Sequence, residues 1–194
     1  MTRIYRYVLA HDYGMAPCPS GGRITLGTCK PVIHRCARAG DWVAGFRPGS
    51  LERGLMLWAG KVAAIMDHGR YQQLFPARPD AVYQAKADGY VRLQPGYHPT
   101  DAEMARDLSA PVLLFDPASS VYLDGVAECL PLALQHLAPA GRGHRVSCVR
   151  PDDVVDFENW IALLRQSQGE ETKGTSPTIR CGKPRSAEAC APRC

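Results

Sequence analysis

The sequence predicts an α+β domain built on a curved mixed β-sheet or a small open β-barrel, flanked by short helices. The chain has 194 residues, 45% of them hydrophobic, which is enough for one domain with a substantial core. Its 18 glycines and 16 prolines favour many turns and short elements over a helical bundle. Seven or eight short strand-like runs are mixed with three or four short helical ones, and this mixture indicates the α+β class.

The first half of the chain is predicted to be rich in strands. β-Branched and aromatic runs place these strands at 4–10, 23–26, 42–46 and 55–66. The last of them is a long apolar run that we expect to be buried and bent or bulged at Gly60, with a helix as the alternative. Short helical segments are expected at 32–39, after Lys30-Pro31, and at 67–75, before Pro76.

The second half is predicted to mix a hairpin, strands and helices. Asp88-Gly89 suits a tight hairpin turn between strands at 82–84 and 90–93. Thr100 and Glu103 form a capping box for a helix to Leu108. The remaining elements are a strand at 111–115, a helix from about Pro131 to Leu137, a strand at 145–149, and a helix to Gln166 capped by Asp152 or Asp153.

Composition divides the chain into one globular domain, residues 1–168, and a tail, residues 169–194. In the tail Ile179 is the only large aliphatic residue, too little for a packed core, so we expect disorder there. We expect the basic residues of the tail to be exposed to solvent, and the alternative is that they contact a polyanion. They are Lys173, Arg180, Lys183, Arg185 and Arg193.

Charge and motifs exclude several classes of protein. The net charge of +4 permits an acidic partner such as a nucleic acid without requiring one. The first ten residues lack the features of a secretory signal, and no uncharged apolar run approaches ~20 residues, so we expect a cytoplasmic protein without a membrane partner. The eight cysteines include no CxxC pair, which favours reduced thiols without a metal site. The usual hydrolase, metalloprotease and nucleotide-fold motifs are missing, and we expect no cofactor.

Residues 5–45 hold the densest set of unusual residue types. The loop from His11 to Gly22 contains polar, aromatic, proline and glycine residues without strand or helix periodicity, which predicts a surface loop of definite shape. His11 and Asp12 are candidate general bases. Cys29 is a candidate nucleophile whose thiol pKa the neighbouring Lys30 would lower, with a small packed cysteine as the alternative. The other histidines are expected in surface or structural roles.

A binding pocket is the second feature that this stretch suggests. Aromatic walls are expected from Tyr13, Trp42, Trp58 and Tyr71, although both tryptophans also suit a core. Cationic side chains are expected to meet a phosphate or a base edge. The candidate ligand-binding residues are Asp12, Tyr13, Gly14, Lys30, Arg35, Trp42 and Arg78.

Two strings, YVLAHDYGMAPCPSGG and TLGTCKPVIHRCARAGDWVAGF, resemble the second type of nucleotide modification associated domain, which is found in bacteria and phages. The similarity extends over residues 4–145. It departs from the family pattern at VYQA (82–85) and YLDG (122–125). The residues that match the family pattern are His11, Asp12, Tyr13, Gly14, Pro17, Gly22, Cys29, Lys30, Pro31, Arg35, Gly40, Asp41 and Trp42.

The resemblance implies an association with systems that make or process modified nucleotides and bases. The Gly-Asp-Trp turn is also similar to that of PUA-like and EVE-like domains, small barrels that bind RNA or modified bases. The first hypothesis is therefore a module that binds a nucleotide or a nucleic-acid base, preferably a modified one. In it Tyr13 or Trp42 stacks on the base, Asp12 accepts a hydrogen bond, and Lys30 or Arg35 contacts phosphate. The alternatives are an enzyme that uses His11, Asp12 or Cys29, and a partner-binding protein without a small ligand.

Overall fold

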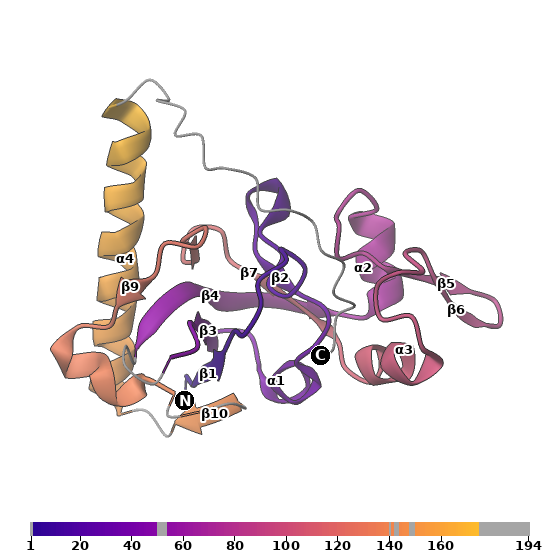
Figure 1. The fold of residues 1–194 in the computed structure, drawn as a ribbon, viewed down its shortest axis with the longest axis horizontal. Coiled ribbons are helices and arrows are strands. Elements are labelled where there is room, and N and C mark those ends of the chain that lie inside the picture. Colours follow the sequence, from indigo (N-terminus) through magenta and orange to yellow (C-terminus); the bar gives the residue numbers. More distant parts are fainter. Residues whose placement is uncertain (1, 50–53, 140, 142–143, 148–149, 175–194) are drawn as a thin grey trace.

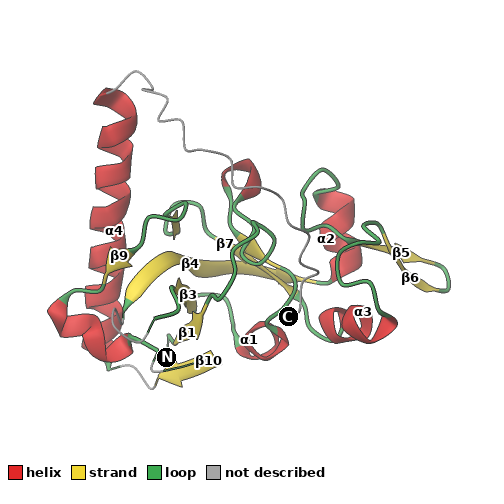
Figure 2. Cartoon of the chain, viewed as in Figure 1, coloured by secondary structure: helices red, strands yellow, loops and turns green. Residues whose placement is uncertain are grey.

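The computed structural model describes residues 2–49, 54–139, 141, 144–147 and 150–174. Within these residues, eight strands form one mixed sheet and two more form a separate hairpin, with helices packed around them (Figures 1 and 2). This confirms the α+β class and the mixed sheet. The strand path β10-β1-β3-β4-β7-β2 begins and ends on different strands, so the sheet is not closed into a barrel.

Strand β4 (Leu55–Met66) is the longest strand of the described chain and joins the two halves of the sheet. On one side lies β3 (Trp42–Phe46), antiparallel to β4 and parallel to β1 (Ile4–Val8), and β1 in turn pairs with β10 (His144–Ser147). The far end of β4 pairs with β7, and β7 pairs with β2. The remaining sheet strands are β2 (Thr25–Leu26), β7 (Val112–Phe115), β8 (Val121–Tyr122) and β9 (Glu128–Cys129).

Two irregularities in β4 flank the predicted position. Gly60 pairs in register with Val43, and the register shifts instead on either side of it. Against β3 the shift lies between Trp58 and Met56, and against β7 it lies between Val62 and Ala64. Gly60 has a different role. A Cβ atom there would lie 2.6 Å from the ring of Phe115, so the missing side chain makes room for that ring.

The helices are α1 (Pro31–Cys36), α2 (His68–Leu74), α3 (Asp101–Leu108) and α4 (Pro151–Gly174), with short 3₁₀ segments η1 (Ser20–Gly22) and η2 (Leu132–Leu137). Side-chain caps mark the starts of α2 and α3, whereas α1 begins without one and Asp152 and Asp153 lie inside the first turn of α4. The predicted capping box of Thr100 and Glu103 is present at α3. At α4 the Asp153 carboxylate accepts a hydrogen bond from the Arg150 amide. Helix α4 includes the first six residues of the predicted tail, 169–174, and the rest of that tail, 175–194, lies outside the described residues.

The predicted hairpin forms, but its turn is one residue earlier than expected. Strands β5 (Tyr83–Lys86) and β6 (Gly89–Arg92) pair Lys86 with Gly89, so Ala87 and Asp88 are the turn residues. Gly89 then begins β6 with a φ of 133°, a backbone conformation that favours glycine.

The two faces of the sheet are covered by different elements. Alternate residues of a strand point to opposite faces, and so Trp42 and Val43 belong to different core clusters. The Trp42 face packs against Phe157 and Ile161 of α4, while the Val43 face packs against Ile33 of α1. Figure 1 shows α4 and α1 on opposite sides of β1 and β3. In the described part of the chain, no helix combines the length and apolarity needed to span a bilayer.

Candidate active site

Three side chains from three segments meet beside the N-terminal end of α1. Cys29 lies in the turn before α1, His98 in the loop before α3, and Asp107 near the end of α3. Cys29 Sγ is 3.4 Å from His98 Nε2, and His98 Nδ1 is 2.5 Å from Asp107 Oδ2. A thiol, an imidazole that contacts it and a carboxylate that orients the imidazole are the parts of a cysteine nucleophile system.

Asp107 holds this cluster together from the buried side. Its carboxylate accepts hydrogen bonds from the Tyr83 hydroxyl at 2.8 Å and from the Cys29 backbone amide at 3.4 Å, in addition to the contact with His98. Asp107 and His98 are only 2% and 3% exposed. A buried carboxylate with several donors keeps a fixed orientation, so the imidazole next to it is fixed as well.

The backbone is strained at two of the three members. Cys29 has a φ of 68° and His98 a φ of 45°, both in the left-handed region that costs a residue with a side chain about 1 kcal/mol or more. Of the described residues other than glycine, only Asp124 shares this property. Strain of this kind persists where the surrounding structure imposes it, and it concentrates at functional sites.

The electrostatics favour a thiolate next to an imidazolium. The hydrogen bond to Asp107, together with that to Cys29, raises the pKa of His98 to about 11. Burial raises the pKa of the Cys29 thiol, but hydrogen bonds from His98 and Tyr97 and the charge on His98 outweigh burial, and the net pKa is lowered. Both shifts favour a Cys29 thiolate paired with a His98 imidazolium near neutral pH.

Tyr97 completes the surroundings of the thiol. Its ring stacks on the ring of His98, with 4.2 Å between centroids and 15° between planes. Its hydroxyl lies 2.6 Å from Thr28 Oγ1 and 3.6 Å from Cys29 Sγ. Burial is the main cause that raises the pKa of Tyr97, so this hydroxyl stays protonated and can donate to the sulfur.

A cleft of about 230 Å³ lies beside Cys29, between the end of β1 and the first turn of α1. Tyr7 and Lys30 line it together with Cys29. The Lys30 ammonium lies 5.0 Å from the centroid of the Tyr7 ring, a cation–π contact. Lys30 therefore adds a positive charge to a cleft that also contains the candidate nucleophile.

The opening loop lies close to the same cleft. Asp12 and Cys29 both contribute to the raised pKa of Tyr7, so both lie within electrostatic range of one buried hydroxyl group. The Asp12 carboxylate accepts hydrogen bonds from the Tyr122 hydroxyl at 2.8 Å and from the Gly14 amide at 3.1 Å. Asp12 and Cys29 therefore both lie near the end of β1 that carries Tyr7.

His11 and Tyr13 form an exposed pair on this loop. Their rings stack with 5.8 Å between centroids and 15° between planes. Tyr13 is 74% exposed, so one face of the pair is open to solvent. This position on an exposed loop suits His11 and Tyr13 for recognition at the surface.

The structure moves Trp42 out of the expected pocket. Trp42 is 2% exposed, its indole N–H donates to Glu158 at 3.0 Å, and its ring meets Phe157 edge-on. It faces α4 because the alternation along β3 points it to that side of the sheet. Trp42 is therefore packed in the core against α4. Trp58 and Tyr71 are fully buried as well.

Arg78 and Arg35 also lie away from the thiol. Arg78 donates to the carbonyl oxygens of Cys18 and Arg23 and forms an ion pair with buried Asp80 at 3.3 Å. These hydrogen bonds attach the end of the opening loop to the buried ion pair of Arg78 with Asp80. Arg35 is exposed on α1 and donates to Ser109 Oγ at 3.2 Å.

Sequence reasoning missed His98 and Asp107. His98 was expected in a surface or structural role, and the structure buries it 69 residues along the chain from its partner Cys29. No spacing in the sequence signals such a contact. The one available rule is that a cysteine nucleophile takes its histidine and acid from distant parts of the chain. For the part of the chain that the structure describes, no group of three or more metal-binding side chains is arranged to hold a metal ion.

The Cys29 thiol is expected to react with iodoacetamide at pH 6 at least about tenfold faster than the exposed Cys36 thiol. The lowered pKa of Cys29 keeps it as thiolate at a pH where an ordinary thiol, of pKa about 8.5, is protonated. Its rate should fall only as the pH drops through that lowered pKa. Peptide-resolved mass spectrometry measures both sites in one sample. His98→Ala should remove the difference, and equal rates in the unaltered protein would contradict the ion pair.

The fold and the cluster together define an α+β protein with a cysteine, histidine and aspartate arranged as in cysteine-dependent enzymes. Residues 1–88 of the chain match the model of the family described as nucleotide modification associated domain 2, in agreement with the resemblance of the opening strings. The matched segment contains Cys29, while His98 and Asp107 lie beyond its end. No match was found among the curated proteins or among the solved structures.

Proposed function

We propose that this protein is an enzyme that acts on a nucleotide or a nucleic-acid base, with Cys29 as its covalent nucleophile. The observation that carries the proposal is the 3.4 Å contact of Cys29 Sγ with His98 Nε2, backed by the 2.5 Å contact of His98 Nδ1 with Asp107. The class of substrate comes from the family description, which associates the domain with nucleotide modification.

The arrangement suits hydrolysis at a carbonyl or amidine carbon of the base or of a group attached to it. The Cys29 thiolate attacks that carbon, a C–S bond forms, and the electron pair of the double bond moves to its oxygen or nitrogen. When the double bond re-forms, the leaving nitrogen departs with the proton from His98 Nε2. Neutral His98 then takes a proton from water, the resulting hydroxide attacks the same carbon, and the Cys29 thiolate is released.

Asp107 acts through the imidazole. Its carboxylate accepts a hydrogen bond from His98 Nδ1–H, which leaves His98 Nε2 directed at the sulfur. Nε2 is then the atom that gives and takes the proton. Lys30 offers a positive charge for a phosphate group next to the cleft. Asp12 offers a carboxylate to the polar edge of the base.

A second candidate function is binding of a base without turnover. The observation that favours it is the stacked pair of His11 and Tyr13, because Tyr13 is 74% exposed and presents a flat ring to solvent. Base stacking on such a ring contributes about 1–3 kcal/mol and does not need catalytic groups. In this case a modified base is selected by contacts with Asp12 and Lys30.

The test is incubation of the full chain with a panel of normal and modified nucleotides and short oligonucleotides. Mass spectrometry then searches for a product and for an adduct on the peptide that contains Cys29. An adduct or product that disappears in Cys29→Ala and persists in Cys129→Ala, which removes an exposed thiol, supports the enzyme. Selective binding with neither adduct nor product would support the second candidate. If nothing in the panel binds or reacts, both candidates fail and a partner-binding protein is the remaining hypothesis.

A further inference from the structure

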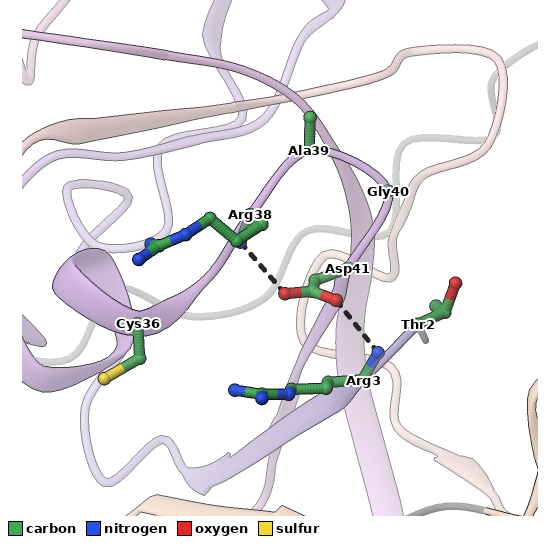
Figure 3. A pocket seen from close by; sticks show the side chains of 7 residues that line it. All are labelled: Thr2, Arg3, Cys36, Arg38, Ala39, Gly40 and Asp41. Atoms are coloured by element: carbon green, nitrogen blue, oxygen red, sulfur yellow. Dashed lines mark hydrogen bonds between the residues drawn. The ribbon is translucent and has the colours of Figure 1, made fainter.

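A second cleft, of about 390 Å³, lies at the C-terminal end of α1 (Figure 3). Arg3 and Arg38 line it together with Cys36 and Asp41. The two arginines come from separate segments, Arg3 from the start of β1 and Arg38 from the turn after α1. Parallel pairing of β1 with β3 brings the two segments together.

Asp41 organises this cleft without neutralising it fully. Its two carboxylate oxygens accept hydrogen bonds from the backbone amides of Arg3 and Arg38, each at 2.9 Å. Asp41 is 5% exposed, so its carboxylate lies inside the wall of the cleft, where the two backbone amides occupy it. Figure 3 shows the side chains of Arg3 and Arg38 extending past Asp41 in the same direction, on the side of Cys36.

The guanidinium of Arg38 has a fixed position. One of its nitrogens, Nη1, donates to the carbonyl oxygens of Arg35 and Ala37, both at 3.0 Å. An arginine held in this way loses less side-chain entropy when it binds an anion, and its planar group suits phosphate oxygens. The cleft thus combines volume, positive charge and preorganised donors.

Helix α1 connects this cleft to the candidate active site. The cleft beside Cys29 lies at the start of α1, and the arginine cleft lies at its end. Val32, Arg35 and Cys36 are the exposed positions of the helix, at the i, i+3, i+4 spacing of one face. Positive side chains therefore follow α1 from Lys30 through Arg35 to the arginine cleft. A helix of six residues is about 9 Å long, which corresponds to roughly three stacked nucleotides.

We infer that the arginine cleft binds the phosphate backbone of a nucleic-acid strand, so that the base at Cys29 belongs to a strand and is not a free nucleotide. The inference deepens the proposed function and rests on it for the identity of the group at Cys29. A free nucleotide fills one cleft and leaves the other empty. A strand that lies along α1 places phosphates at both clefts.

The test compares Arg3→Gln/Arg38→Gln with the unaltered protein for binding to a short single-stranded oligonucleotide and to the mononucleotide of the same base, over a series of salt concentrations. The double variant should bind the oligonucleotide about tenfold or more weakly, and the slope of log K against log salt should fall by about two. Mononucleotide affinity should stay within about twofold. Arg70→Gln/Lys86→Gln, which removes two exposed charges at α2 and β5, is the matched control and should change neither affinity.

Protection of Cys36 from alkylation gives a readout that does not depend on catalysis. Oligonucleotide bound along α1 should slow labelling of Cys36 and leave labelling of exposed Cys129 unchanged, and it should do so in Cys29→Ala as well. Equal losses for oligonucleotide and mononucleotide, or no loss for either, would overturn the strand inference. Loss of turnover in Cys29→Ala tests the proposed function separately, because the arginine cleft is intact in that variant.

Discussion

Replacement of Cys29 by alanine is expected to lower turnover by about 10³-fold or more. The thiolate supplies the only covalent step, and without it the substrate depends on direct attack by water. Alanine tolerates the φ of 68° at this position about as well as cysteine does, so the backbone and the neighbouring clefts should keep their shape. Binding of the same oligonucleotide should therefore stay within about twofold. The measurement is single-turnover product formation on whichever substrate the panel identifies.

Variants of His98 and Asp107 are expected to lose turnover non-additively with variants of Cys29. His98→Ala is expected to lose about as much turnover as Cys29→Ala, and the double variant no more than either, because groups that act as one unit are not additive. Asp107→Asn should retain substrate binding while it loses turnover. Cys129→Ala, which removes an exposed thiol outside both clefts, is the matched control. Full activity in Cys29→Ala would remove the cysteine from the mechanism.

Replacement of Asp80 by alanine is expected to lower the free energy of unfolding by about 3–5 kcal/mol. The Asp80 side chain is fully buried and accepts hydrogen bonds from Thr25 Oγ1 at 2.5 Å and from the Tyr71 hydroxyl at 2.7 Å. It also pairs with Arg78, whose side chain is only 10% exposed. Removal of the carboxylate leaves a nearly buried positive charge and two hydroxyl groups without their acceptor.

The loop that carries the candidate ligand-binding residues should loosen in the same variant. Arg78 is tied to the carbonyl oxygens of Cys18 and Arg23, and this tie depends on Asp80 to hold the guanidinium in place. Urea unfolding measures the stability, and alkylation of buried Cys18 measures opening of the loop. Asp88→Ala, in the exposed hairpin turn, removes the same charge at little cost and is the control. A change below about 1 kcal/mol in Asp80→Ala would show that the network contributes little.

Local features of this protein could be predicted from the sequence because they depend on residues that are neighbours along the chain. Three such features formed where the sequence predicts them. They are the strand at 42–46, the capping box of Thr100 with Glu103, and the start of a short helical segment directly after Pro131. The turn of the hairpin was displaced by one residue, and β4 is irregular on both sides of Gly60 and not at Gly60 itself. Backbone preferences extend over a few residues and leave the exact register to side-chain packing.

Tertiary packing decided which of the conspicuous residues form the site. The alternation along β3 indicates that Trp42 and Val43 face opposite ways, but only the position of α4 decides that the Trp42 face is buried. Cys29 could be named as a candidate from its own residue type and its neighbour Lys30. His98 and Asp107 could not, since they reach Cys29 across 69 and 78 residues through the docking of α3 and its preceding loop. Contacts between segments so far apart depend on how whole elements pack, and no local pattern in the sequence encodes them.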